Sequence, residues 1–79
     1  MLYMTQDAVE ALLADQPDIM TPQEVADLLR VSHHTIARWR RDGRLRAFDM
    51  GRTVRIRKED LRELLQAAYG QPPKGDDET

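Results

Sequence analysis

The sequence predicts a small, mostly α-helical domain that carries one β-hairpin. Its 79 residues suffice for a single domain around one core. Two short helices with clear start signals are predicted between Met20 and Gly43, separated by only a brief turn. The helical spacing of apolar residues then gives way to alternation in T53-V-R-I-R57, which is typical of a strand.

The first of the two helices has a complete start signal in M20-T-P-Q-E-V25. Thr21 is a suitable N-cap, Pro22 suits the first helical position, and Glu24 can close a capping box. Met20 and Val25 have the spacing of a hydrophobic staple around that cap. The apolar stripe that follows at helical spacing consists of Val25, Leu28 and Leu29, and it ends near Arg30.

The second helix is predicted from about His33 to Asp42. Ser32 provides its N-cap, and Gly43 stands where a left-handed residue commonly ends a helix. Because the turn between the two helices is so short, they must cross at a steep angle. This is the geometry of a helix-turn-helix.

The second helix has two contrasting faces. On a helical wheel, Ile36, Trp39 and Arg40 share the side that must pack on the first helix, with the Arg40 stem over the core and its head reaching solvent or phosphate. The outward side and the amino end of this helix carry the polar residues His33, His34, Thr35, Arg38 and Arg41.

A two-stranded hairpin and a last helix complete the central region. Leu45–Phe48 and Thr53–Arg57 each alternate apolar with polar residues, and Asp49–Arg52 joins them with Gly51 as the turn residue. A helix is predicted over residues 59–68, with acidic residues in its first turn. Its buried stripe is predicted to be Leu61, Leu64, Leu65 and Ala68.

Two flanks remain outside this region. Residues 5–14 have apolar positions at helical spacing and predict an additional amphipathic helix. Residues 70–79 offer no apolar side chain for burial, so we expect a disordered acidic tail. The predicted units are therefore an N-terminal helix and linker (1–19), a central domain (20–69) and the tail (70–79).

The charge of the chain is strongly segregated. Eleven basic and only four acidic residues lie from Arg30 to Arg62, a net +7, whereas the remaining residues carry −9, which gives the overall −2. The basic middle is suited to a polyanion, which the overall charge alone would hide.

Several classes of function lack support in the sequence. The chain has no cysteine, no stretch resembling a signal peptide and no apolar run near the ~20 residues of a membrane span, so a cytoplasmic protein without membrane contact is expected. We see no paired carboxylates, nucleophile–base set or phosphate loop at a usable spacing. His33 and His34 diverge by about 100° on a helix and have no third ligand nearby. We therefore expect neither an enzyme nor a cofactor, metal or small-molecule substrate.

The order helix, turn, helix, basic hairpin, helix is that of a winged helix-turn-helix domain. Several ordered blocks, T21-P-Q-E-V-A-D-L-L-R-V-S32, T35-I-A-R-W39, G43-R-L45, G51-R-T-V-R-I56 and E59-D-L61, closely resemble the small excisionase family. Members of that family are phage and plasmid recombination directionality factors, related to the DNA-binding domain of MerR-type regulators. The resemblance covers about residues 20–65, more than half of the chain.

The resemblance implies that the second helix enters the major groove of double-stranded DNA and that the hairpin, or wing, touches the adjacent minor groove or backbone. The family's groove-facing positions fall on His33, His34, Thr35 and Arg38, and its wing tip on Arg52. With the helix cap and the other arginines of the basic middle, the predicted DNA-binding residues are Ser32, His33, His34, Thr35, Arg38, Arg41, Arg46, Arg52, Arg55 and Arg57.

Roles without DNA contact remain open for several of these residues. Arg38 and Arg41 could form an ordinary solvated helix face, although acids are absent there until Asp42. Thr35 could cap its helix or touch a thymine methyl. Trp39 is expected in the core, with base stacking as its alternative. Arg46, Arg55, Arg57 and Lys58 are read as backbone-phosphate contacts.

Three functions follow from the sequence. The first is an excisionase of a bacterial phage system that bends attachment-site DNA, assembles cooperatively on it and helps an integrase excise the phage. The second is a small MerR-like transcriptional regulator, although such regulators usually append a dimerisation helix and an effector domain, and this chain stops at Thr79 with neither. The third is a non-DNA module, such as an antitoxin or an adaptor that presents the N-terminal helix to a protein.

Overall fold

The computed structural model describes residues 5–69, which form four helices and a three-stranded antiparallel sheet. The predicted tail, residues 70–79, lies outside the described residues. In chain order the elements are α1 (Thr5–Leu13), β1 (Ile19–Met20), α2 (Pro22–Leu29), α3 (His33–Arg41), β2 (Phe48–Met50), β3 (Thr53–Arg57) and α4 (Lys58–Ala68). This is a winged helix-turn-helix arrangement, as the sequence predicted, with the extra helix α1 packed against α4.

The predicted start of α2 is confirmed in detail. The Thr21 side chain accepts a hydrogen bond from the Glu24 backbone N–H at 3.0 Å, and the Glu24 carboxylate accepts one from the Thr21 N–H at 2.9 Å. Met20 and Val25 are both fully buried, as expected for a staple. The capping box and the staple therefore set where α2 begins.

The turn between α2 and α3 depends on a left-handed residue that the sequence did not reveal. Arg30, the C-cap of α2, has φ of 61° and ψ of 44°, a conformation more usual for glycine. Its N–H donates to carbonyls of the last turn of α2, and the Val31 N–H donates to the Ala26 carbonyl at 3.0 Å. The chain thereby reverses quickly enough for α3 to pack on α2.

The sheet differs from the predicted two-stranded hairpin in two respects. A third strand, β1, pairs with β3 through Ile19–Arg57 and Met20–Ile56, so the strand order is β1-β3-β2. The first strand of the hairpin is Phe48–Met50 rather than Leu45–Phe48, and only Gly51 and Arg52 form its turn. The cause of the shift is that Arg44 and Leu45 both donate backbone hydrogen bonds to the Trp39 carbonyl, at 2.9 and 3.2 Å, which holds them to the end of α3.

One core joins the four helices, β1 and β3, whereas all three residues of β2 are exposed. Its buried hydrophobic residues are Val9, Leu13, Met20, Val25, Ala26, Ile36, Leu45, Ile56, Leu61 and Leu64. Trp39 and Leu65 pack against this core but stay partly exposed, and Ala68, predicted as part of the buried stripe of α4, is exposed because it lies at the open end of that helix.

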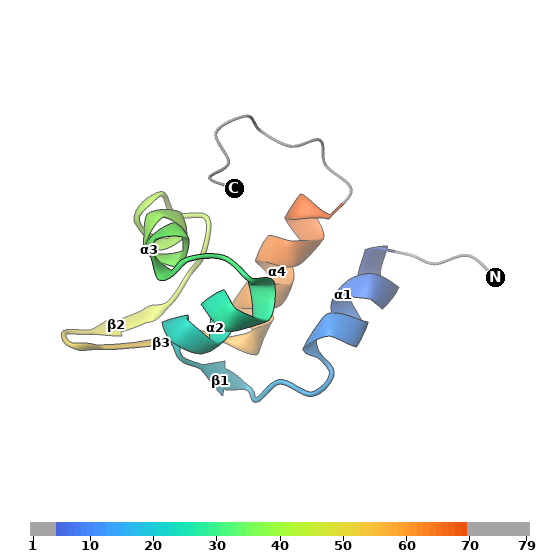
Figure 1. The fold of residues 1–79 in the computed structure, drawn as a ribbon, viewed down its shortest axis with the longest axis horizontal. Coiled ribbons are helices and arrows are strands. Elements are labelled where there is room, and N and C mark those ends of the chain that lie inside the picture. The colour runs from blue at the N-terminus through green and yellow to red at the C-terminus, as the bar shows by residue number, and fades with distance from the viewer. Residues whose placement is uncertain (1–4, 70–79) are drawn as a thin grey trace.

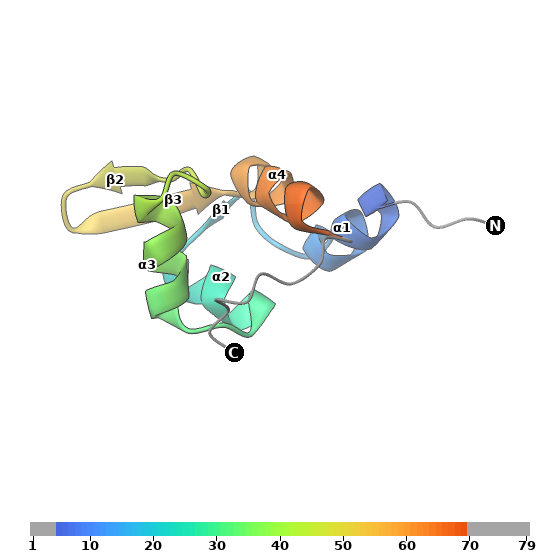
Figure 2. The same cartoon turned by 90° about the horizontal axis from the view of Figure 1, so that it is seen from above.

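Helix α3 and the hairpin lie together at the end of the molecule opposite α1 (Figures 1 and 2). The hairpin extends beyond the helices, so its tip stands clear of the rest of the domain. The elements with the most arginines are thus placed side by side, away from the acidic N-terminal helix.

Candidate nucleic-acid interface

Helix α3 is held firmly at both ends and along its inner side. The Ser32 hydroxyl accepts a hydrogen bond from the Thr35 N–H at 3.2 Å, which caps the helix start. Gly43, just beyond the C-cap, has φ of +80°, as the sequence predicted for the residue that ends this helix. Ile36 is 1% exposed and ties the helix to the core. The outward side of α3 therefore has a well-defined orientation.

That outward side presents four of the ten predicted contact residues. His33, His34 and Arg41 are exposed, and Arg38 is half-buried. The two histidine rings lie against each other, with centroids 4.2 Å apart and planes tilted by 33°. Their aromatic and N–H groups are thus presented together at the start of α3, where backbone N–H groups also favour an anion.

Thr35 does not share this exposed side. It is 3% exposed, and its hydroxyl lies 3.2 Å from the Ser32 hydroxyl, a hydrogen-bond distance. Of the two roles considered for Thr35, the structure accordingly provides the one in the helix cap, and its side chain is not on the surface where a DNA contact was predicted. Ser32 is exposed, but its oxygen serves the same cap.

The wing tip is formed by a tight turn with Arg52 exposed on it. Gly51 has φ of +81°, which glycine adopts without strain, and its N–H donates to Asp49 Oδ1 at 3.2 Å. The turn therefore has its own hydrogen bond, and Arg52 is one of the two turn residues at the tip of the hairpin, which extends beyond the helices (Figure 1).

The remaining predicted arginines are not equivalent. Arg57 binds Asp60 with two hydrogen bonds, Nε to Oδ2 at 2.9 Å and Nη2 to Oδ1 at 3.1 Å. This fork raises the pKa of Arg57 and lowers the pKa of Asp60, which burial alone would raise. Arg55 donates to the adjacent Val54 carbonyl at 2.8 Å. Arg57, predicted to bind phosphate, thus already has a carboxylate partner at the start of α4.

Other basic residues of the middle region stabilise the fold. Arg62 forms ion pairs with Glu10 of α1 and, at 2.7 Å, with Glu59. The hydrogen bond from Arg62 lowers the pKa of Glu10 and the same contacts raise that of Arg62. Lys58 donates to the Gln16 carbonyl at 2.9 Å. Arg62 and Lys58 therefore make their contacts within the fold, whereas Arg41 on α3 and Arg52 in the wing turn are exposed.

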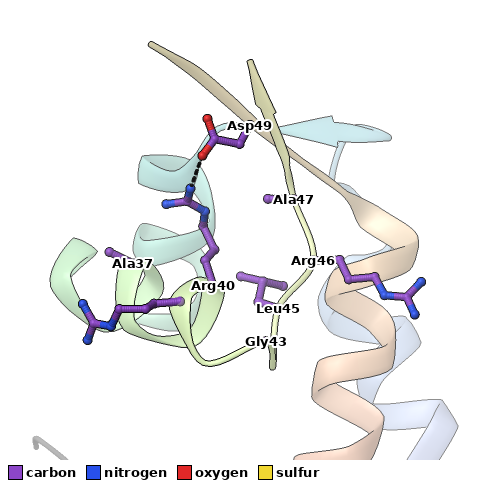
Figure 3. A pocket seen from close by; sticks show the side chains of 8 residues that line it. Ala37, Arg40, Gly43, Leu45, Arg46, Ala47 and Asp49 are labelled. Carbon is purple, nitrogen blue, oxygen red and sulfur yellow. Dashed lines mark hydrogen bonds and ion pairs between the residues drawn. The ribbon is translucent and has the colours of Figure 1, made fainter. Parts of the chain in front are cut away.

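A groove with a volume of about 610 Å³ lies between α3 and the segment that leads into β2 (Figure 3). Arg40 of α3 reaches across it, and its Nη2 lies 3.2 Å from Asp49 Oδ2 on β2. Arg46 also lines the groove, but its guanidinium points away from this pair (Figure 3). It contributes to the lowered pKa of Asp60.

Within residues 5–69, no group of three histidine or acidic side chains is placed to hold a metal ion. No helix in the same range is long and apolar enough to cross a membrane.

Comparison with known proteins agrees with this geometry. Residues 19–69 match the model of a family described as "Helix-turn-helix domain", and this match runs from β1 to α4 and leaves α1 outside. Searches of curated proteins and of solved structures gave no significant match. The family includes small excisionase-like DNA-binding proteins. Because the match covers more than half of the sequence, the chain belongs to this helix-turn-helix family of DNA-binding domains.

Proposed function

We propose that the protein is an excisionase, which binds and bends attachment-site DNA and directs an integrase towards excision. The observation that carries the proposal is the placement of two separate basic elements, α3 and the wing, at one end of the domain (Figure 2). A protein that only marked a site would need α3 alone, whereas a wing that grips a second groove can also hold DNA in a bent shape.

In this proposal α3 lies in the major groove. Arg38 and Arg41 contact guanine edges or phosphates, because a guanidinium can bind guanine O6 and N7 with two hydrogen bonds. His33 and His34 contact phosphate or a base edge from the start of the helix, where both are exposed. Arg52 enters the adjacent minor groove, whose negative potential is greatest where it is narrow.

The partners follow from the resemblance to excisionases carried by the blocks between Thr21 and Leu61. Several copies bind repeated sites side by side, and the catalytic steps of recombination belong to the integrase. A MerR-like regulator would use the same domain at a promoter. The following experiment distinguishes such a regulator from an excisionase.

The test is a recombination reaction with a matching integrase and DNA that carries the attachment sites of that integrase. Wild-type protein should raise the yield of excision and leave integration without stimulation. Arg52→Ala should lower that yield and reduce the DNA bend in a circular-permutation assay. Arg44→Ala is the matched control, because it removes an equal charge from an exposed residue away from the wing tip. If excision proceeds equally without the protein, the excisionase proposal is wrong and the regulator takes its place.

A further inference from the structure

The groove between α3 and β2 has an unusual mixture of charge. Arg40, Arg41 and Arg46 line it, while small residues such as Ala37 and Ala47 leave it open. Asp49 is the one acidic residue of this lining within the described chain. This carboxylate lies beside three arginines at the end of the molecule that faces DNA in our proposal. A negative charge in such a place needs an explanation.

The position of Asp49 explains part of its role. In the hairpin register Asp49 is opposite Val54, so both side chains are on one face of the sheet, the same face as the buried Ile56 two residues further along β3. That face is turned to α3, where Asp49 Oδ2 meets Arg40 (Figure 3). Its other oxygen, Oδ1, accepts the Gly51 N–H of the wing turn. Asp49 thus joins the wing turn to α3.

The ion pair is accessible enough to be exchanged. The Arg40 side chain is 25% exposed and the Asp49 side chain 58% exposed. Exposed pairs of this kind contribute little net stability, so another anion that is held in the same place can replace the carboxylate. A phosphodiester is such an anion, because, like a carboxylate, it carries one negative charge and accepts the forked hydrogen bonds of a guanidinium.

The docking geometry brings a phosphodiester to this groove. A major groove and the adjacent minor groove are separated by one sugar–phosphate strand. If α3 occupies the first and the wing the second, that strand must pass between them, across the groove that Arg40 and Asp49 span. This step rests on the proposed binding mode.

We propose that this groove is a phosphodiester-binding site, and that Asp49 is an internal counter-ion which occupies Arg40 until a DNA phosphate replaces it. Asp49 then weakens binding to all duplex DNA, and its carboxylate remains attached to the wing turn through Gly51. A DNA phosphate reaches Arg40 only when α3 and the wing both contact DNA. The exchange therefore stabilises the complex in which both elements are bound, relative to complexes in which only one of them is bound.

Asp49→Asn tests the exchange with little change to the turn, because the asparagine side-chain oxygen can still accept the Gly51 N–H. The matched control is Asp42→Asn, which removes the same charge from the exposed residue at the end of α3. Each change is made alone and together with Arg40→Gln. Dissociation constants are measured on a short random duplex over a series of salt concentrations, with circular dichroism to verify folding.

Asp49→Asn should bind about twofold to fivefold more tightly than wild type, the range expected when an exposed ion pair no longer competes. Most of this gain should disappear in the Arg40→Gln background, whereas any effect of Asp42→Asn should be the same in both backgrounds. Arg40→Gln alone should lower the slope of log affinity against log salt by about 0.9, the value for one phosphate contact.

Two results would overturn the exchange. Weaker binding by folded Asp49→Asn would mean that the ion pair persists in the complex and positions the wing. A gain equal to that of Asp42→Asn, and independent of Arg40, would mean that Asp49 acts only through the overall charge. Neither result depends on recombination, so failure of the excision reaction with normal behaviour of these variants would reject the excisionase role alone.

Discussion

The packing of α3 on the core predicts that Ile36→Ala destabilises the domain without removing any group that faces DNA. Ile36 is 1% exposed and belongs to the single core cluster. The exposed Arg41, five residues later on the same helix, provides the opposite case. The two variants therefore separate the contribution of α3 to folding from its contribution to binding.

The expected magnitude follows from the buried atoms. Ile→Ala removes three carbons, which at about 0.8 kcal/mol each amounts to about 2.4 kcal/mol of lost transfer free energy. The cavity left in the core adds to this loss, while the better helix propensity of alanine offsets about 0.4 kcal/mol. We expect the free energy of unfolding to fall by about 2–4 kcal/mol, out of a total of about 4–12 kcal/mol for a domain of this size.

Urea unfolding followed by circular dichroism measures this loss. Arg41→Ala, the control, should change the free energy of unfolding by less than about 0.5 kcal/mol but weaken DNA binding. Ile36→Ala should retain DNA affinity when measured at low temperature, where it is still folded. A loss below about 1 kcal/mol for Ile36→Ala, or a larger loss for Arg41→Ala, would refute the assignment of the two faces of α3.

Three further predictions concern single residues. Arg38→Ala should cost about 1–3 kcal/mol of binding free energy on the specific site and less on random DNA, and equal losses on both in a gel-shift assay would contradict a base contact. Trp39→Ala should cost less than the ~3–5 kcal/mol of a fully buried aromatic in urea unfolding, because this side chain is only partly covered; a full-size loss would show that it is central to the core. Because the hydrogen bond from Arg57 is the largest cause of the lowered pKa of Asp60, the stabilisation from this carboxylate is present above about pH 4 and lost as pH falls through its folded-state pKa. Asp60→Asn should therefore destabilise the domain at pH 7 and reduce the fall in stability towards pH 2, and an unchanged pH profile in unfolding experiments would contradict this account.

Local signals in the sequence were sufficient for the helices. The capping box at Thr21, the cap at Ser32 and the stop at Gly43 each involve residues within a few positions of one another, so the sequence alone predicts them. The two-residue strand β1 was missed because so short a segment has no periodicity to detect. The left-handed Arg30 was missed because residue type gives no indication of it.

The location of the candidate interface could be predicted from the sequence, but the ion-pair partners of its arginines could not. The basic character of α3 and the hairpin was evident from residue types and spacing. The partners of the arginines were not, since the Arg40–Asp49 and Arg62–Glu10 contacts join residues on different elements. Arg57 and Asp60 are near in sequence, and an arginine three residues before an aspartate at a helix start is a signal that could have indicated their pairing.

Hydroxyl-radical footprinting on attachment-site DNA tests the central claim most directly, because it maps the backbone contacts of both α3 and the wing. We predict protection on both sides of a major groove, with an additional protected stretch in the adjacent minor groove that is lost in Arg52→Ala. Repeated protection at neighbouring sites is expected as more protein is added. The radical could instead cleave the attachment site uniformly at protein concentrations that saturate other duplex DNA. That result would contradict the claim that α3 and the wing bind this site.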